Sequence, residues 1–444
     1  MRTLIPRKAP QLLLQTVDGT HAYAVNCASP HSFRVLNGSQ YRILKEINGQ
    51  DDIDGLARKL FMSPEALEPL LSMLAKSELV RFDNCFTAPR KPSGPKSLNF
   101  WIHTTDACNL GCSYCYISTL NTSKGMSDIV KRQLLSKLVE TAGKRKIRTV
   151  KFRLAGGEPL SQFKNWKRFI PEAAYALQQV GCKLDVAFIT NLTILNDDIL
   201  DFSKEHNITY GISMDGVEQV HDLTRKFRSG VGSFHVVDAN LRKLLAHNIP
   251  VSVNTVVTNQ NLEGLPELTR YLVGLDVPFR YSIVKGEAVN AELLEENLLL
   301  SYSIMKEAIE TGWQFSRRHQ FCDLKPNELG FQTCASGFSG GAIYVDGSFK
   351  YCHVHFGDNS GSGRSIFNPD IDLVDMIQQS GQYQEAKSED CKQCRFRFVC
   401  TSGCPVYREN GKDPQCSIYH KFIPLYYELQ ARERLKLLRS CGKI

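Results

Sequence analysis

The sequence has no long apolar run and no long block of one charge sign. No apolar stretch reaches the ~18 residues with which a helix crosses a bilayer, and the N-terminal segment MRTLIPRKAPQ lacks the continuous apolar core of a secretory signal. The net charge of +8 is spread over 54 basic and 46 acidic residues, so nothing demands a nucleic-acid partner. We therefore expect a cytoplasmic protein without a membrane or nucleic-acid partner.

Cysteine, in contrast, is plentiful. Because cytosolic thiols are kept reduced, fifteen cysteines in a chain with no export signal favour metal or redox chemistry over disulfides. Three lie near residue 110 and eight lie between residues 322 and 416, which predicts two separate metal-rich regions. With 444 residues, 42% apolar and 23% charged, the chain is globular and long enough for two or three domains.

The first region opens with alternating residues on both sides of Asp18-Gly19, a pair typical of a hairpin turn. Apolar residues at helical spacing follow, and a short strand pattern ends the region. Pro69 lies inside the last helical pattern and predicts an interruption of that helix. Strands, three helices and a terminal strand predict a small winged-helix domain over residues 1–86. Residues 87–97 contain three prolines and no apolar periodicity, and we expect a linker.

From residue 98, strand patterns alternate with helical ones. The expected strands are 98–105, 150–157, 184–191, 208–215, 250–257 and 277–284, and the expected helices are 127–144, 162–180, 196–206, 234–247 and 262–275. Six β/α units predict an α/β fold with a parallel sheet, a partial (β/α)6 TIM-like barrel over residues 98–318. The first cysteine group and the stretches AGGEP, TN and SMDG each follow a strand, so we expect them to meet at one mouth.

The C-terminal region, residues 319–444, has weak periodicity, many glycines and eight cysteines. We expect metal, more than an apolar core, to hold it together. A final helix is expected at about 421–438.

The stretch TTDACNLGCSYCYIS carries Cys108, Cys112 and Cys115 on a loop directly after a strand. All-thiolate ligation favours zinc or iron–sulfur. Zinc sites usually combine two C-x2-C pairs, whereas three thiolates on a 4Fe-4S cluster leave one iron open to a substrate or cofactor. Zinc or a buried thiol group remains the alternative for this motif taken alone.

The spacing C-x3-C-x2-C, an aromatic residue before the third cysteine and GGE at 156–158 together resemble the radical S-adenosylmethionine (SAM) enzymes. The resemblance implies that SAM fills the open iron and that its reductive cleavage gives a 5′-deoxyadenosyl radical. It implies SAM-binding roles for Tyr114, Gly156, Gly157, Glu158, Asn191, Ser213, Asp215 and Arg225.

Physical reasons accompany these assignments. Gly156 and Gly157 permit close approach of the backbone to a ligand, and Glu158 is an acceptor suited to the SAM ammonium group. In the family, the ends of strands three and four contact the ribose, and an arginine in the position of Arg225 pairs with the SAM carboxylate.

The C-terminal cysteines resemble the SPASM domain of radical SAM peptide-modifying enzymes, including the glycine before Cys352. The resemblance implies two auxiliary 4Fe-4S clusters, which makes three with the SAM cluster. The outer cluster would be held by Cys391, Cys394, Cys400 and Cys416, and the inner one by Cys334, Cys352, Cys404 and the candidate Cys322. A free Cys322 thiol beside an open inner cluster is the alternative. A zinc ribbon on Cys391 and Cys394 would leave the other cysteines without a role.

Residues 1–85 hold ten Lys/Arg and nine Asp/Glu, where a DNA-binding domain would show a basic face. The order of elements instead resembles the recognition domain of ribosomal-peptide maturases, which adds the leader peptide to a sheet edge as an extra strand.

We therefore expect a maturase that binds the leader of a precursor peptide and oxidatively cross-links a core residue through a thioether, C–C or ether ring. A low-potential electron donor such as flavodoxin or ferredoxin is implied. The stretch YCHVHFG at 351–357 resembles thioether-forming maturases, whereas anaerobic sulfatase maturases carry aspartate at the place of His353. A sulfatase-maturase-like oxidase, a peptide epimerase and a winged-helix iron–sulfur sensor are the alternatives. No catalytic acid or base is singled out.

Overall fold

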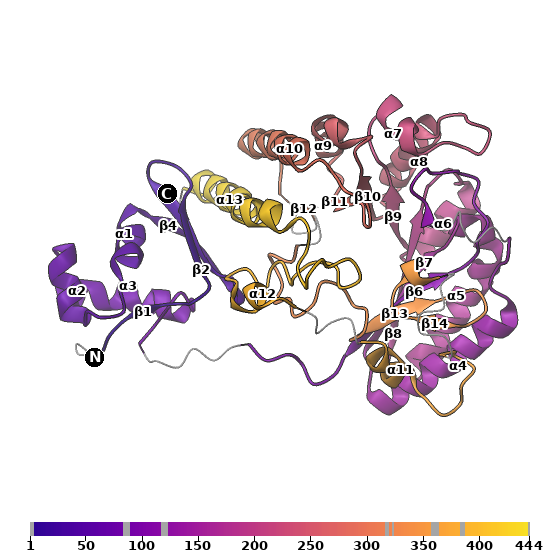
Figure 1. The fold of residues 1–444 in the computed structure, drawn as a ribbon, viewed down its shortest axis with the longest axis horizontal. Helices are drawn as coiled ribbons and strands as arrows, with labels where there is room; N and C mark the ends of the chain where they lie inside the picture. The colour runs from indigo at the N-terminus through magenta and orange to yellow at the C-terminus, as the bar shows by residue number, and fades with distance from the viewer. Residues whose placement is uncertain are drawn as a thin grey trace. The chain divides into compact units, whose positions relative to one another are not determined.

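The computed structural model describes residues 4–82, 89–116, 123–315, 319–321, 324–356, 364–381 and 387–442 (Figure 1). Contacts between Cα atoms divide the chain into two compact units. The barrel unit comprises residues Pro92–Asn297 and Cys334–Ala386, and the terminal unit comprises Met1–Lys91, Leu298–Thr333 and Lys387–Ile444. The domain boundaries expected from the sequence remain predictions.

The barrel unit has a mixed α/β fold. Its strands are β6 (Ser97–His103), β7 (Thr149–Ala155), β8 (Lys183–Thr190), β9 (Thr209–Ser213), β10 (Val251–Val257), β11 (Phe279–Ile283), β13 (Gly340–Ile343) and β14 (Phe349–Lys350). Its helices are α4 (Asp128–Arg145), α5 (Phe163–Gln178), α6 (Asp197–Glu205), α7 (Gln219–Thr224), α8 (Phe234–Ala246), α9 (Leu265–Gly274) and α11 (Leu373–Gln379), with 3₁₀ turns η2 (Pro159–Gln162), η3 (Leu262–Gly264) and η4 (His353–His355).

The six strands expected from the sequence are confirmed, and they lie in chain order from β6 to β11, each parallel to the next. A parallel sheet in which neighbours in sequence are neighbours in space, with a helix between each pair, has the order of a barrel wall. The sequence did not indicate β13, which pairs with β6 along the edge that β7 does not occupy. A Cβ at Gly340 would lie 1.9 Å from the Asn99 carbonyl oxygen, so only glycine permits this pairing.

The two faces of this sheet differ in character. Along β7, Val150, Phe152 and Leu154 are buried, whereas Lys151 and Arg153 between them are exposed. Because side chains alternate along a strand, the buried set belongs to the face that the helices cover, and the exposed set belongs to the inner face. The inner face, defined here as the face opposite the helices, therefore carries polar side chains.

The terminal unit begins with short strands and three helices. Its elements are β1 (Arg7–Lys8), β2 (Leu12–Thr16), β3 (His21–Asn26), β4 (Ser29–Asn37), α1 (Gly38–Glu46), α2 (Ile53–Leu60), α3 (Pro64–Lys76) and β5 (Val80–Arg81), followed by the end of α10 (Ala291–Thr311), β12 (Gln320–Phe321), α12 (Glu389–Gln393) and α13 (Cys416–Ser440). Strands β2, β3 and β4 form an antiparallel sheet, and β1 pairs with β5.

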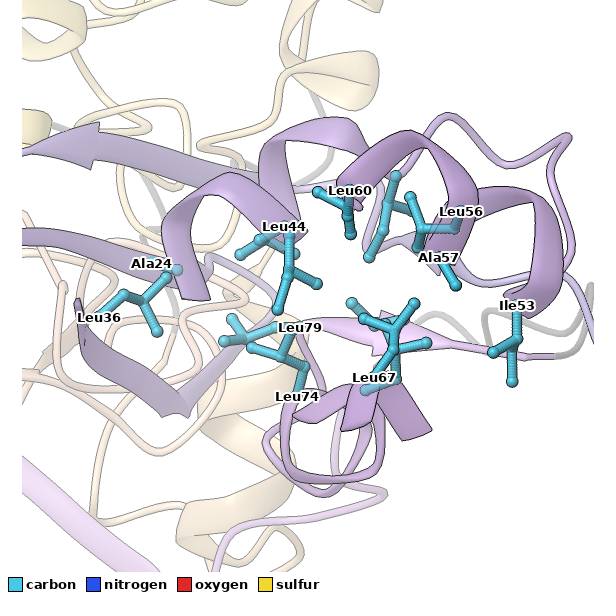
Figure 2. Packing of buried hydrophobic residues seen from close by; sticks show 14 of the residues in the cluster. Ala24, Leu36, Leu44, Ile53, Leu56, Ala57, Leu60, Leu67, Leu74 and Leu79 are labelled. Atoms are coloured by element: carbon cyan, nitrogen blue, oxygen red, sulfur yellow. The ribbon is translucent and has the colours of Figure 1, made fainter. Parts of the chain in front are cut away.

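Both faces of the three-stranded sheet are covered. On one face, Ala24 and Leu36 pack with Leu44, Leu67 and other apolar residues of the three helices (Figure 2). On the other face, the Tyr23 hydroxyl donates to the Pro424 carbonyl in α13 at 2.8 Å, and the rings of Tyr23 and Tyr427 lie 6.4 Å apart. Covering both faces leaves the sheet edges as the accessible part of its backbone.

The structure corrects one expected helix and extends another. Helix α3 continues through Pro69 to Lys76, because Ser63 caps its N-terminus and the exposed Pro69 removes only one hydrogen bond of the ladder. Helix α13 starts at Cys416, five residues before the expected start, and places that cysteine in its first turn. Among the described residues, no helix combines the length and apolarity that a bilayer crossing requires.

Candidate functional site

Cys108, Cys112 and Cys115 lie on the loop that follows β6, called the cysteine loop below, and all three are partly exposed. Backbone hydrogen bonds fix this loop against residues 224–228: Gly111 donates to the Lys226 carbonyl at 2.8 Å, and Ser113 donates to the Thr224 carbonyl at 3.1 Å. Burial raises the pKa of the Cys108 thiol to about 11, and the charges of Cys112 and Cys115 contribute to the rise, so the three thiols are electrostatic neighbours.

N–H groups surround the sulfur atoms. The Leu110 amide donates to Cys108 Sγ at 3.4 Å, the Asn191 side-chain amide reaches the same sulfur at 3.6 Å, and Arg225 Nη1 lies 3.8 Å from Cys112 Sγ. Such donors stabilise thiolates and the negative charge of an iron–sulfur cluster. Three neighbouring thiols with N–H donors therefore fit the predicted 4Fe-4S cluster. Among the described residues, no three His, Cys, Asp or Glu side chains are arranged to bind a single metal ion.

Gly156 and Gly157 pack against the backbone of the cysteine loop. A Cβ at Gly157 would lie 2.1 Å from the Ala107 carbonyl oxygen, and one at Gly156 would lie 2.4 Å from that of Thr105. The Gly157 amide donates to the Thr105 carbonyl at 2.6 Å, and the next amide, that of Glu158, donates to the Ala107 carbonyl at 2.8 Å. The loop itself thus requires both glycines, and their contact with SAM stays a prediction.

Glu158 is fully buried and already has three donors. Its Oε1 accepts from the Thr190 hydroxyl at 2.6 Å and the Leu160 amide at 2.9 Å, and its Oε2 accepts from the Asn191 amide at 2.8 Å. Burial raises the pKa of this carboxyl to about 7, against the effect of these hydrogen bonds. Glu158 therefore ties the end of β7 to the end of β8, and its role as a SAM ligand stays a prediction.

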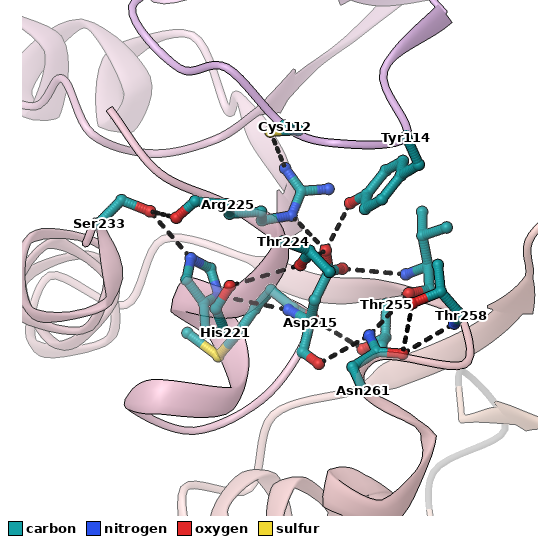
Figure 3. Close-up of polar contacts among 12 residues, drawn as sticks. Cys112, Tyr114, Asp215, His221, Thr224, Arg225, Ser233, Thr255, Thr258 and Asn261 are labelled. Carbon is teal, nitrogen blue, oxygen red and sulfur yellow. Dashed lines mark hydrogen bonds and ion pairs between the residues drawn. The ribbon is translucent and has the colours of Figure 1, made fainter. Parts of the chain in front are cut away.

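Asp215 is the centre of a buried polar network (Figure 3). One carboxylate oxygen accepts from Tyr114 at 2.5 Å, Thr224 at 3.0 Å and Arg225 Nε at 2.8 Å, and the other accepts from the Val256 amide at 3.1 Å. Burial alone would lower the pKa of Arg225, but Asp215 and the neighbouring Tyr114 and Cys112 raise it. The guanidinium is therefore a permanent cation beside the cysteine loop.

His221 connects the backbone of Asp215 to Ser233 and thereby extends this network. Its Nδ1 accepts the Asp215 amide at 3.3 Å, its Nε2 lies 3.0 Å from the Ser233 hydroxyl, and that hydroxyl donates to the Arg225 carbonyl at 2.9 Å. Burial lowers the pKa of His221 to about 4, with the charge of Arg225 contributing. A neutral imidazole protonated on Nε2 satisfies every contact in this chain.

The structure brings the predicted SAM residues together at the carboxyl ends of the strands. Asn191 follows β8 and reaches the cysteine loop, and Tyr114 contacts Asp215 after β9. Ser213 is the last residue of β9 and lies in register with Asn254 of β10. Their individual SAM contacts stay predictions.

Sequence reasoning missed a second buried network beside the loop. His103 Nε2 lies 2.9 Å from Asp106 Oδ1, and the Tyr344 hydroxyl donates to both oxygens of Asp106 at 2.9 and 2.8 Å. Asp106 precedes Cys108 by two residues, whereas Tyr344 follows β13. This network anchors the start of the cysteine loop to a distant segment, and no spacing in the sequence indicates that pairing.

In the terminal unit, the structure brings together the four cysteines expected at the outer cluster. The charges of Cys391 and Cys394 raise the pKa of Cys416, and those of Cys416 and Cys391 raise that of the buried Cys400, although burial is the larger cause for both. Cys394 Sγ also lies 3.4 Å from His420 Nε2 of α13.

The cysteines predicted to bind the inner cluster belong to different units of the chain. Cys404 belongs to the terminal unit and is partly exposed, whereas Cys334 and Cys352 belong to the barrel unit. Cys322 lies outside the described residues. The inner cluster thus stays a prediction.

Comparisons with known proteins identify the domain that contains this site. The radical SAM superfamily model matches residues 102–272, which include the cysteine loop, the two glycines and Arg225. An uncharacterized protein of Methanocaldococcus jannaschii, MJ0907, is 32% identical over 177 residues, which are 40% of this chain and only 58% of that protein. The cysteine-type anaerobic sulfatase-maturating enzyme of Clostridium perfringens is 22% identical over 72% of this chain and 93% of its own.

Two solved structures share the fold. The structure of anSMEcpe with bound AdoMet has a TM-score of 0.60 at 19% identity, covering 78% of this chain and all of that one. Streptococcus suis SuiB bound to its precursor peptide SuiA has a TM-score of 0.50 at 14% identity, covering 93% of this chain and 99% of that one. The chain thus carries a domain of the radical SAM superfamily, whose cofactors are SAM and a 4Fe-4S cluster.

Proposed function

We propose that this chain is a maturase that binds the leader of a ribosomally made precursor peptide and oxidatively cross-links a residue of its core. The observation that carries the proposal is a radical SAM site in the same chain as a small three-stranded, three-helix N-terminal domain. We assign that domain as the winged-helix recognition domain and residues 319–444 as the SPASM domain.

The edge strand β4 is the proposed place for the leader. It has nine residues, and in its three-stranded sheet it neighbours only β3. Helices cover one face of the sheet and α13 covers the other, so an extended peptide has the edge for main-chain hydrogen bonds. The fold likeness to SuiB, which extends over 93% of this chain, supports an assignment that includes this domain.

The chemistry assigned to the barrel unit follows from its residues. When bound, the cluster and SAM supply a 5′-deoxyadenosyl radical that removes hydrogen from the substrate. Cys108, Cys112 and Cys115 would hold the cluster, and Arg225, fixed by Asp215, would offer a cation to the SAM carboxylate. Closing the ring also requires loss of one proton and a second electron, and the C-terminal cysteines would hold the auxiliary clusters that would accept that electron.

The test is anaerobic reaction of the reduced enzyme with the short peptide encoded beside its gene, followed by mass analysis. Loss of two hydrogens without aldehyde reactivity towards a hydrazide supports a cross-link, whereas an unchanged mass with uptake of solvent deuterium indicates epimerisation. A peptide without its leader should react at least tenfold more slowly. The Cys112→Ala variant, the matched control, should neither cleave SAM nor modify the peptide.

Iron content tests the cluster assignment separately. Three 4Fe-4S clusters require about twelve irons per chain. The Cys112→Ala variant should keep about eight, because the C-terminal cysteines are untouched. A wild-type value near four would contradict the auxiliary clusters.

The sulfatase-maturase similarity favours a second candidate function, oxidation of a cysteine or serine side chain to an aldehyde. A sulfatase-derived peptide that gains hydrazide reactivity on incubation with the enzyme would support it. The same peptide unchanged, with the neighbouring precursor cross-linked, would support the first proposal.

A further inference from the structure

The inner face of the barrel sheet carries two arginines that the SAM site does not use. Arg153 lies in the middle of β7, and Arg280 lies in β11, the last of the six parallel strands. Both side chains are exposed, whereas the residues on either side of each in its strand are buried. Both guanidinium groups therefore belong to the inner face.

These two arginines come from strands that are four positions apart in the sheet. In a flat sheet, a spacing of about 4.8 Å between strands would separate β7 from β11 by about 19 Å, well beyond the range of screened charges in water. The pKa of Arg153 is nevertheless lowered, first by burial and then by the charge of Arg280. Consecutive β/α units curl such a sheet into a barrel wall. The two side chains therefore face one interior that is open to solvent yet enclosed by protein, in agreement with the lowered pKa of Arg153.

Within the part of the chain that the structure describes, the Arg153 guanidinium has no anionic partner. Among the described residues it makes no side-chain hydrogen bond or ion pair, whereas Arg280 Nε donates to Asn254 Oδ1 at 3.0 Å. Asp185 on neighbouring β8 is an acidic residue of the same face, and it already pairs with Lys183 at 2.8 Å. A cation repelled by another cation and lacking a carboxylate leaves a binding site for one.

Trp101 adds a further donor beside Arg153. The two residues are in register on adjacent strands β6 and β7. The indole Nε1 is buried and has no acceptor among the described residues, and its ring stacks on His353 with centroids 4.1 Å apart. Indole and guanidinium groups can only donate hydrogen bonds, so a ligand that satisfies them must bring acceptor oxygens.

The position of this site suits a substrate. Arg153 precedes Gly156 by three residues on the same strand, so it lies about 10 Å deeper in the barrel than the glycines that contact the cysteine loop. Arg280 is in register with Asn254, which is itself in register with Ser213 at the end of β9. A peptide reaching the SAM site from the inner face would pass these side chains.

We propose that Arg153 and Arg280, together with the Trp101 indole, bind a carboxylate of the substrate peptide next to the residue that is modified. The inference rests on the proposed peptide-modifying function and names its substrate class, an acidic core peptide. The carboxylate is either an Asp or Glu side chain or the C-terminal carboxylate. Planar guanidinium groups hold such a carboxylate through paired hydrogen bonds and thereby fix the position of the neighbouring carbon.

The test compares Arg153→Gln and Arg280→Gln with Lys183→Gln, a cation of the same face that already has a partner. With the precursor peptide encoded beside the gene, both arginine variants should lose at least about 30-fold in kcat/KM for peptide modification, because leaving one charge of a bound pair unpaired typically costs that much. Lys183→Gln should lose less than about threefold. SAM cleavage without peptide should stay within about twofold of the wild type in all three variants.

Peptide variants identify the source of the carboxylate. If an acidic side chain is bound, its Asp→Asn or Glu→Gln change in the core should reproduce the loss, and a core Asp→Lys change should be rescued by Arg153→Glu. If the C-terminus is bound, amidation of the peptide should reproduce the loss. Full activity of a peptide that lacks core acids and carries a C-terminal amide would overturn the proposal.

The design separates this proposal from the proposed function. An enzyme that never modifies the peptide but cleaves SAM would refute the peptide assignment and leave no substrate for the arginines. An enzyme that modifies the peptide equally well with and without Arg153 and Arg280 would keep the function and refute only the carboxylate site.

Discussion

Replacing Gly157 by alanine should destroy the SAM cluster without changing a cysteine. The added Cβ would lie 2.1 Å from the Ala107 carbonyl oxygen, and real Cβ atoms essentially never come within 3.0 Å of another heavy atom, so the loop must yield by about 0.9 Å. That shift breaks the hydrogen bonds from the Gly157 amide to Thr105 and from the Glu158 amide to Ala107. The cysteine loop would leave its position against β7.

The magnitude follows from two contributions. Forcing an extra carbon into a packed site costs about 1–3 kcal/mol, and each lost backbone hydrogen bond costs about 0.5–1.5 kcal/mol. The expected loss is therefore about 2–6 kcal/mol, a large part of the stability of an ordinary domain. Gly111→Ala is the matched control, because its Cβ would meet no atom nearer than Arg228 Cγ at 4.0 Å.

The assay is iron and sulfide content after anaerobic reconstitution, together with urea unfolding and SAM cleavage. Gly157→Ala should lose about four irons relative to the wild type, and Gly111→Ala should keep them. If Gly157→Ala kept every iron and lost only SAM binding, the glycine would serve close approach of SAM instead of the loop, and the reasoning from the loop contact would be refuted.

Three further predictions concern the supporting networks. Asp215→Asn should cost about 3–5 kcal/mol and weaken SAM binding, because it leaves the buried Arg225 cation without its carboxylate. Asp198→Asn, in an exposed ion pair with Lys167, is the control and should cost about 1 kcal/mol or less by urea unfolding. His221 has a folded pKa of about 4, below the unfolded value of 6.5. The stability it contributes is therefore present above pH 6.5 and falls by up to about 3 kcal/mol on acidification to pH 4. In urea unfolding, the stability of His221→Gln should depend less on pH, and an unchanged dependence would contradict the buried neutral imidazole. Tyr23→Phe should lower stability by about 1 kcal/mol through its lost hydrogen bond to α13, while SAM cleavage without peptide stays unchanged.

Much of the fold follows from local patterns in the sequence. The alternation of six strands with helices is visible because each strand brings a short apolar run and each helix a longer periodic one. The N-terminal hairpin is visible for a similar reason, since Asp18-Gly19 lies between two alternating runs. Strand β13 is invisible because its four residues, GGAI, show no period, and its partner β6 lies more than 200 residues earlier.

For the candidate site too, the sequence predicts the features that depend on short-range spacing. Sequence spacing by itself determined that Cys108, Cys112 and Cys115 share a loop, and strand order determined that GGE and SMDG lie at the same end of the sheet. Both are short-range properties, because a loop of eight residues cannot separate its thiols and the ends of parallel strands must share an edge.

Only the tertiary structure decided what these residues do for one another. It assigned the two glycines to the cysteine loop, paired Asp215 with Arg225 and Tyr114, and tied Tyr344 to Asp106. These contacts depend on how far the sheet curls and on which distant segment closes its edge, and both are set by packing over the whole unit, which no local pattern encodes.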